Sequence, residues 1–125
     1  MNYLVCEECG RNEGIELHHI IFKSQSPCMA NIEINFKYLC YKCHRGNDGP
    51  HLNRVKDLEY KYRLQNKLFE KFSSKAYYTE EEIRKLLKIS KGEASKILKK
   101  LKVYKEGYCK IELIQRLMGG RIYAK

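Results

Sequence analysis

Two Cys-x-x-Cys pairs constrain this chain more than any other feature of its sequence. Cys6 and Cys9 form the first pair, and Cys40 and Cys43 form the second. Thiolates at this spacing can hold a tetrahedral cation from a tight turn, so two pairs supply the four sulfurs of a closed zinc site. In a plain zinc ribbon about 15 to 20 residues separate the pairs, whereas thirty residues separate Cys9 from Cys40. The sequence therefore predicts one structural zinc site with a segment inserted into it.

Size and cysteine usage agree with a protein that a metal stabilises. A chain of 125 residues forms one domain or two small ones, with limited room for a core. Six cysteines are present, without a signal-peptide pattern or an apolar run long enough to span a bilayer. We therefore expect reduced thiols, a cytoplasmic location and no membrane partner. Disulfides are the alternative use of the paired cysteines.

Positive charge is concentrated in the C-terminal part of the chain. Residues 1–73 hold 11 Lys and Arg against 9 Asp and Glu, a net charge of +2. Residues 74–125 hold 14 against 6, a net charge of +8. A polyanion would therefore be attracted mainly by the second part.

The residue pattern predicts an α+β fold. A short strand is expected over residues 1–11, an apolar-rich strand over 15–22, and an apolar segment over 32–36 before the second cysteine pair. After a flexible turn at 45–50, apolar residues at helical spacing predict one amphipathic helix over 53–72.

Two short helices with a tight turn between them are expected next. Thr79 with Glu82, and Ser90 with Glu93, are capping-box patterns that each begin a helix. A hairpin wing at residues 104–110 and a third helix at 111–118 would complete a module that resembles a helix-turn-helix.

The second of these helices carries basic and polar side chains beside its apolar face. Such a surface is typical of a recognition helix that lies on DNA. The alternative is a solvated charged face on a small helical bundle. The residues expected to bind DNA are Lys91, Ser95, Lys96, Lys99 and Lys100.

All four histidines lie within or just beyond the segment that the cysteines enclose. His18 and His19 are adjacent, His44 directly follows Cys43, and His51 follows a short loop. Neighbouring residues on a regular strand face opposite sides, so a bend or bulge is needed to bring His18 and His19 to one site. His44 could instead replace a cysteine in the zinc site.

The order of these residues resembles the HNH endonuclease family, whose members share a ββα-metal fold. The resemblance covers roughly the first 55 residues and implies a nuclease module at 1–55. The C-terminal part lies outside the resemblance, and the residue pattern alone predicts a connecting helix at 56–73 and a helix-turn-helix-like domain at 74–125 there. The matching residues are Glu16-Leu17-His18-His19-Ile20, then Asn35 through Leu39-Cys40, then Cys43-His44, and finally His51.

The resemblance implies hydrolysis of DNA phosphodiester bonds to 5′-phosphate and 3′-hydroxyl ends. One general base and one metal ion suffice for this reaction. His19 is then the base, and His18, His44 and His51 bind one divalent cation, which could be Mg²⁺, Mn²⁺, Ni²⁺ or Zn²⁺.

The resemblance also implies supporting roles around this site. Asn35 is expected to hold the metal loop or to orient the base, and Glu16 to orient a ligand or the substrate. Asn47 or Asp48 could replace His51 as the third ligand.

Two other functions fit the same sequence. A non-enzymatic zinc-containing regulator would bind DNA without cutting it, and an RNA-directed nuclease would use the same chemistry. Small proteins of this family are frequent in phages and mobile elements, which implies homing, packaging or DNA degradation in a bacterial host cytoplasm. Because one active site cuts one strand, double-strand cleavage would need a homodimer or two successive events.

Overall fold

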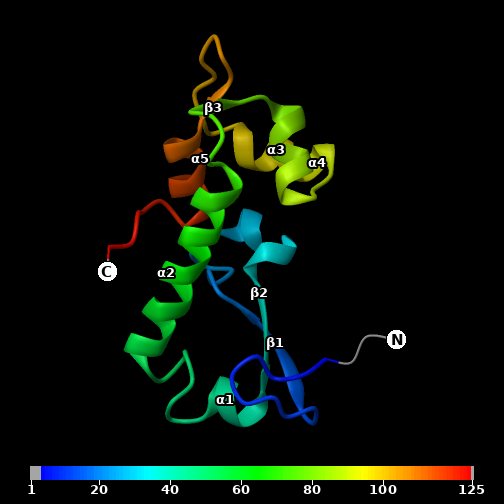
Figure 1. The fold of residues 1–125 in the computed structure, drawn as a ribbon, viewed down its shortest axis with the longest axis vertical. Coiled ribbons are helices and arrows are strands. Elements are labelled where there is room, and N and C mark those ends of the chain that lie inside the picture. Colours follow the sequence, from blue (N-terminus) through cyan, green and yellow to red (C-terminus); the bar gives the residue numbers. More distant parts are fainter. Residues whose placement is uncertain (1–3, 125) are drawn as a thin grey trace.

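One long helix connects the two halves of the molecule. In this computed structural model, which describes residues 4–124, helix α2 (Arg54–Lys71) runs along the long axis (Figure 1). The side chain of Asn53 caps its start by accepting a hydrogen bond from the backbone N–H of Lys56. The predicted helix over 53–72 is therefore confirmed. Its buried face consists of Tyr60, Lys61, Leu64, Gln65 and Leu68.

Residues 4–124 form five α-helices and two small antiparallel sheets, which confirms a mixed α and β fold. The predicted first and last domains extend to residues 1–3 and 125, which lie outside the described residues. Within residues 1–11 the sequence predicts a short strand leading into a metal-binding turn; residues 4–11 form no strand, and a turn at residues 7–9 lies between Cys6 and Gly10. Within the described part of the chain, no helix has both the length and the apolar character needed to cross a membrane.

The N-terminal half is built on one hairpin and a short helix. Strand β1 (Ile15–His19) pairs with β2 (Phe36–Cys40) in continuous antiparallel register, and helix α1 (Tyr41–Arg45) follows β2 directly. Two 3₁₀ turns, η1 (Pro27–Met29) and η2 (Glu33–Asn35), lie between the strands.

The first strand of this half is shorter than its sequence predicts. The strand expected over 15–22 ends at His19, and most of the segment expected over 32–36 is the turn η2. The cause is Asn35, whose backbone carbonyl accepts from Ile20 and whose side chain accepts from the N–H of Ile21. These bonds replace the regular strand ladder, and the chain bends at Ile20 and Ile21.

The C-terminal half contains three short helices and the second sheet. Helices α3 (Glu80–Leu87) and α4 (Lys91–Leu98) both begin with complete capping boxes, as their sequences predict. Strand β3 (Tyr77–Tyr78) pairs with β4 (Tyr108–Cys109), and helix α5 (Lys110–Leu117) follows.

A tight hairpin leads into strand β4. The backbones of Tyr104 and Gly107 exchange hydrogen bonds of 2.8 and 3.1 Å. Gly107 has φ +125°, and a Cβ atom there would lie 2.5 Å from the carbonyl oxygen of Tyr78. Only glycine allows this close approach of the hairpin to β3.

Helix α3 ends at a residue in an unfavourable conformation. Lys88 has φ 56° and ψ 52°, the left-handed region that glycine usually occupies at helix ends. A side chain in this region costs about 1 to 2 kcal/mol. Lys88 is the one non-glycine residue within 4–124 with positive φ.

One hydrophobic core runs through both halves. Leu64 and Leu68 of α2 belong to the same buried cluster as Met29 of η1 and Ile97 of α4. Helix α4 packs against η1, and Gly119 approaches the backbone of Gln25. The position of the histidines and cysteines relative to the C-terminal helices is therefore set by packing.

Gln65 ties the C-terminal segment to α2. Its side-chain amide donates to the carbonyl of Tyr123 at 2.7 Å and accepts from the N–H of Tyr123 at 2.7 Å, and both bonds are buried.

The substitution Gln65→Ala would leave both backbone groups of Tyr123 unpaired, which costs about 1 to 3 kcal/mol for each group. We expect chemical denaturation to show a free energy of unfolding lower by about 2 to 6 kcal/mol, whereas exposed Asn66→Ala should change it little. Equal stability of the two variants would contradict this role.

Candidate metal centres

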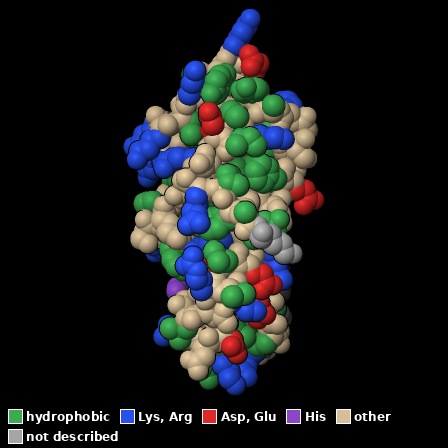
Figure 2. All heavy atoms as spheres, turned by 90° about the vertical axis from the view of Figure 1, so that its left-hand side faces the viewer, with side chains coloured by type: hydrophobic (Ala, Val, Ile, Leu, Met, Phe, Trp, Pro, Cys, Tyr) green, Lys and Arg blue, Asp and Glu red, His purple; other side chains and the backbone are tan. Residues whose placement is uncertain are grey.

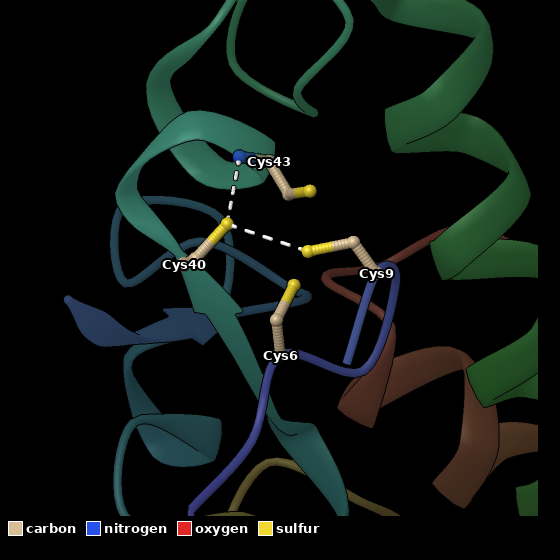
Figure 3. Close-up of side chains that lie close together, drawn as sticks. All are labelled: Cys6, Cys9, Cys40 and Cys43. Atoms are coloured by element: carbon tan, nitrogen blue, oxygen red, sulfur yellow. Dashed lines mark hydrogen bonds between the residues drawn. The ribbon is translucent and has the colours of Figure 1, made fainter. Parts of the chain in front are cut away.

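Four cysteine sulfurs converge at one end of the hairpin. Cys6 and Cys9 come from the N-terminal turn, Cys40 ends β2, and Cys43 lies in α1 (Figure 3). The four sulfur atoms all lie within 4.8 Å of one another, and the sulfurs of Cys9 and Cys40 are 3.8 Å apart. Tetrahedral zinc with bonds of 2.3 Å requires sulfurs about 3.8 Å apart. The cluster could therefore hold a structural metal ion such as zinc.

Backbone geometry turns the sulfurs toward one another. The N–H of Gly10 donates to the carbonyl of Cys6 at 2.8 Å, which closes the first turn. In the second turn, the N–H of Cys43 donates to the sulfur of Cys40 at 3.4 Å. The N–H of Glu7 donates to the carbonyl of Tyr38 on β2, which fastens the first turn to the hairpin.

The thiols of this cluster differ in acidity. Burial raises the pKa of Cys6, but hydrogen bonds from the backbone of Cys40, Cys9 and Glu8 outweigh it and lower this pKa to about 6. The pKa of Cys40 is lowered by its hydrogen bond from the backbone of Cys43. Burial and the neighbouring sulfurs raise the pKa of Cys43. A cation would stabilise the thiolates that otherwise repel one another.

Three histidine nitrogens form a second cluster. His18 comes from β1, His44 from α1, and His51 from the turn before α2. Nδ1 of His18 is 3.2 Å from Nε2 of His44, which lies 3.0 Å from Nε2 of His51. All three atoms lie within 4.8 Å of one another, close enough to share one metal ion. His44 therefore belongs to this cluster, and its alternative place in the cysteine site is wrong.

Glu16 determines which nitrogen of His44 carries a proton. Nδ1 of His44 donates to the Glu16 carboxylate at 2.9 Å, and Arg45 donates to the same carboxylate. These contacts, first that with His44, lower the pKa of Glu16. With Nδ1 protonated, neutral His44 presents an unprotonated Nε2 to the other histidines. Glu16 thus orients the ring of a potential metal ligand.

The pKa values of His18 and His51 are both lowered. Burial, followed by the proximity of His44 and His51, lowers the pKa of His18 to about 3. Desolvation and nearby His44 lower the pKa of His51. Nε2 of His18 is buried and has no hydrogen-bond partner within residues 4–124, whereas Nδ1 faces the cluster. Neutral imidazoles with converging nitrogens are the form that binds metals.

His19 lies beside this cluster without joining it. No bulge interrupts β1, so His18 and His19 leave the strand on opposite sides. The strand ends at His19 and the chain bends directly after it. His19 therefore still lines the same hollow, of about 340 Å³, as His18, His44 and His51.

A backbone carbonyl orients the His19 ring. Nε2 of His19 lies 2.8 Å from the carbonyl oxygen of Ala30. Because a carbonyl only accepts hydrogen bonds, Nε2 must carry the proton and donate it. Nδ1 is then the basic nitrogen of the neutral ring, and the ring of Phe36 packs edge-to-face against it with centroids 5.7 Å apart.

Asn35 holds the loop that supplies this carbonyl. Its side chain is fully buried, accepts from the N–H of Ile21 at 2.7 Å, and donates to the carbonyls of Ile21 and Met29. Met29 directly precedes Ala30. Asn35 therefore holds the backbone on either side of His19's partner loop and is not one of the three clustered histidine ligands.

The alternative third ligands lie elsewhere. Asn47 and Asp48 line a separate hollow of about 420 Å³ together with Cys43 and Tyr60. The geometry brings His51 to the cluster in their place.

Sequence reasoning did not identify the aromatic and charged side chains around His51. The ring of Phe22 stacks on His51 with centroids 5.3 Å apart, and Nζ of Lys61 lies 4.1 Å from the Phe22 ring centroid. Buried Lys61 also pairs with Asp57 at 2.8 Å. The i,i+4 spacing of Asp57 and Lys61 predicts their ion pair on a helix, but it does not predict the contact of Lys61 with Phe22.

Tyr60 connects the two clusters. Its hydroxyl donates to Glu8, between the first two cysteines, at 2.7 Å, and its ring lies edge-on to His18 with centroids 6.2 Å apart. The hydrogen bond from Tyr60 is the main cause that lowers the pKa of Glu8. Tyr60, a residue of α2, therefore couples the position of the cysteine turn to that of His18.

The basic residues expected on the second short helix lie on or just after α4. Three of them, Ser95, Lys96 and Lys99, line a hollow of about 410 Å³ with Tyr108. Arg116 of α5 donates to the carbonyls of Lys96 and Ile97, which anchors this end of α4. The five residues, all exposed, are Lys91, Ser95, Lys96, Lys99 and Lys100.

Comparison of the chain with known protein families, curated proteins and solved structures found no match.

Loss of one cysteine ligand should release the metal and unfold the N-terminal half. Cys40→Ser removes the sulfur that contacts both cysteine turns. We expect the purified variant to contain less than stoichiometric zinc by elemental analysis and to unfold at lower temperature. Cys109→Ser, outside the cluster, is the matched control. A zinc-free Cys40→Ser protein with normal thermal stability would contradict the structural site.

Proposed function

We propose that this chain is a metal-dependent DNA endonuclease of the HNH type, which hydrolyses phosphodiester bonds to 5′-phosphate and 3′-hydroxyl ends. One observation carries the proposal. His19, whose Nε2–H is committed to the Ala30 carbonyl, lines the same hollow as three histidines whose ring nitrogens converge. A general base beside a cation site is what phosphodiester hydrolysis requires.

His19 supplies the base in this reaction. Nδ1 of His19 takes a proton from a water molecule, and the resulting hydroxide attacks phosphorus while the bond to the 3′-oxygen breaks. The departing oxygen takes up a proton from solvent. The Ala30 carbonyl keeps Nε2 protonated throughout and stabilises the imidazolium that forms. Asn35 preserves this geometry by holding Ile21 and Met29.

His18, His44 and His51 would hold the divalent cation. When bound, the cation stabilises negative charge that develops on the phosphate. Glu16 supports this role because its hydrogen bond to Nδ1 of His44 orients the ring so that Nε2 faces the other histidines. The donor set of three imidazoles favours later transition metals over Mg²⁺.

Surface charge is consistent with a nucleic-acid substrate. Figure 2 shows the face of the molecule on which α2 lies. Lys and Arg side chains gather mainly toward the left of this face, where a histidine is visible at the edge, and most Asp and Glu side chains lie to the right. In the proposal, α3 and α4 act as a helix-turn-helix that docks on DNA through the exposed residues of α4.

The two metal centres can be separated by mutation. His51→Ala removes one nitrogen from the histidine cluster and leaves all four sulfurs in place. We expect titration with a divalent cation to detect at least tenfold weaker binding at the second site, while one zinc per chain is retained. Asn47→Ala, on the separate hollow, should bind both ions normally. Unchanged second-site affinity in His51→Ala would remove this residue from the ligand set.

Loss of the base should abolish cleavage but not binding. With supercoiled plasmid and a panel of divalent metals, His19→Ala should nick or linearise DNA about 10² to 10⁴ times more slowly than wild type. Its DNA affinity should be unchanged, and Asn47→Ala should retain full activity. Wild-type cleavage by His19→Ala would refute the assignment of the base. DNA binding without cleavage by the wild-type protein, under every metal, would instead favour a zinc-containing regulator.

A further inference from the structure

A hollow between the two halves of the molecule gathers positive charge outside α4. It has a volume of about 240 Å³ and lies between η2, the C-terminal part of α2, and the turn that joins α3 to α4. Lys67 and Lys71 of α2 line it, together with Lys88 of the turn. Glu33 is the single carboxylate in its lining, so the lining carries a net positive charge.

The three lysines are not neutralised by the protein. Within residues 4–124, none of them belongs to an ion pair. Lys67 and Lys71 are one helical turn apart, a rise of about 6 Å, and face the hollow together. Cations that share a concave surface without partners repel one another, and an anion would relieve this repulsion.

The backbone conformation of Lys88 indicates that its side chain does not serve folding stability. Its left-handed backbone at φ 56° favours glycine, and lysine at this position is unfavourable for stability. Residues held in such conformations are concentrated at functional sites. The exposed Lys88 side chain borders the hollow, where it adds charge.

Phe36 lies between the hollow and the proposed catalytic residue. Phe36, the first residue of β2, belongs to the lining of the hollow, and the same ring packs edge-to-face against His19. A strand whose phosphate lies beside His19 would therefore pass Phe36 to reach the three lysines. Beyond Lys88, the chain leads directly into α4 and its exposed basic residues.

We propose that Lys67, Lys71 and Lys88 bind backbone phosphates of the DNA strand that is cleaved at His19. This inference rests on the proposed function and adds a contact surface between the histidine site and α4. The hollow fixes the path of the strand between the two halves, because the shared core holds them together.

The test is the salt dependence of DNA binding, which does not require cleavage. In a His19→Ala background without added divalent metal, binding to a fluorescent duplex is measured over a salt series. Lys67→Ala, Lys71→Ala and Lys88→Gly are added singly and together. Each lost phosphate contact should reduce the magnitude of the slope of log DNA-association constant against log salt concentration by about 0.9. The slope of the triple variant should therefore be smaller in magnitude by about 2 to 3.

Two controls exclude general damage. Arg63→Ala removes a charge from the same helix, but Arg63 lines a different hollow and pairs with Glu59, so its slope should be unchanged. Lys88→Gly removes the side chain at a position where glycine is favoured. This variant should unfold at the same or a higher temperature than its parent while binding DNA more weakly.

The outcomes distinguish this inference from the proposed function. If wild type cleaves DNA but the triple variant keeps the parental slope, the lysine contacts are wrong and the nuclease proposal stands. If the parent binds no duplex and wild type cleaves none, both are refuted. A loss of slope seen with RNA but not with duplex DNA would overturn the assignment of DNA to this hollow.

Discussion

The cysteine cluster is the constraint on which the rest of the N-terminal half depends. Its sulfurs join the first turn to the end of β2 and the start of α1. Helix α1 is only five residues long, too short to be stable alone, and it carries His44. A metal ion bound by the sulfurs would therefore fix α1, and α1 in turn sets His44 against His18. Tyr60 adds a second connection by contacting both Glu8 and His18.

The histidines show how environment gives one residue type different roles. His18 is neutral because it is buried, His44 has its tautomer set by Glu16, and His19 has its tautomer set by the Ala30 carbonyl. The first two direct a ring nitrogen into a shared cluster. The hydrogen bond to Ala30 instead leaves His19 outside the cluster with its own basic nitrogen. A cation site and a candidate base thus lie side by side without competing for the same atoms.

Packing between the halves gives the basic C-terminal part a defined position relative to the histidines. Leu64 and Leu68 of α2 join buried residues of η1 and α4 into one core. The lysines of α2 and the α3–α4 turn consequently face one hollow, which also contains Phe36. The positive charge that the sequence shows only as a net excess is thereby placed between the histidine hollow and the basic residues of α4, the two proposed DNA contact regions.

Sequence alone determined the elements that depend on local chemistry: the two cysteine turns, the capping boxes at Thr79 and Ser90, and the long amphipathic helix. Their signals lie within a few residues, where spacing directly reflects geometry. The end of β1 at His19, the contact of Lys61 with Phe22 and the lysine hollow were decided by tertiary structure. Each depends on residues far apart in the chain, such as Asn35 bonding to Ile21, whose approach is set by the packing of a shared core and by no local pattern.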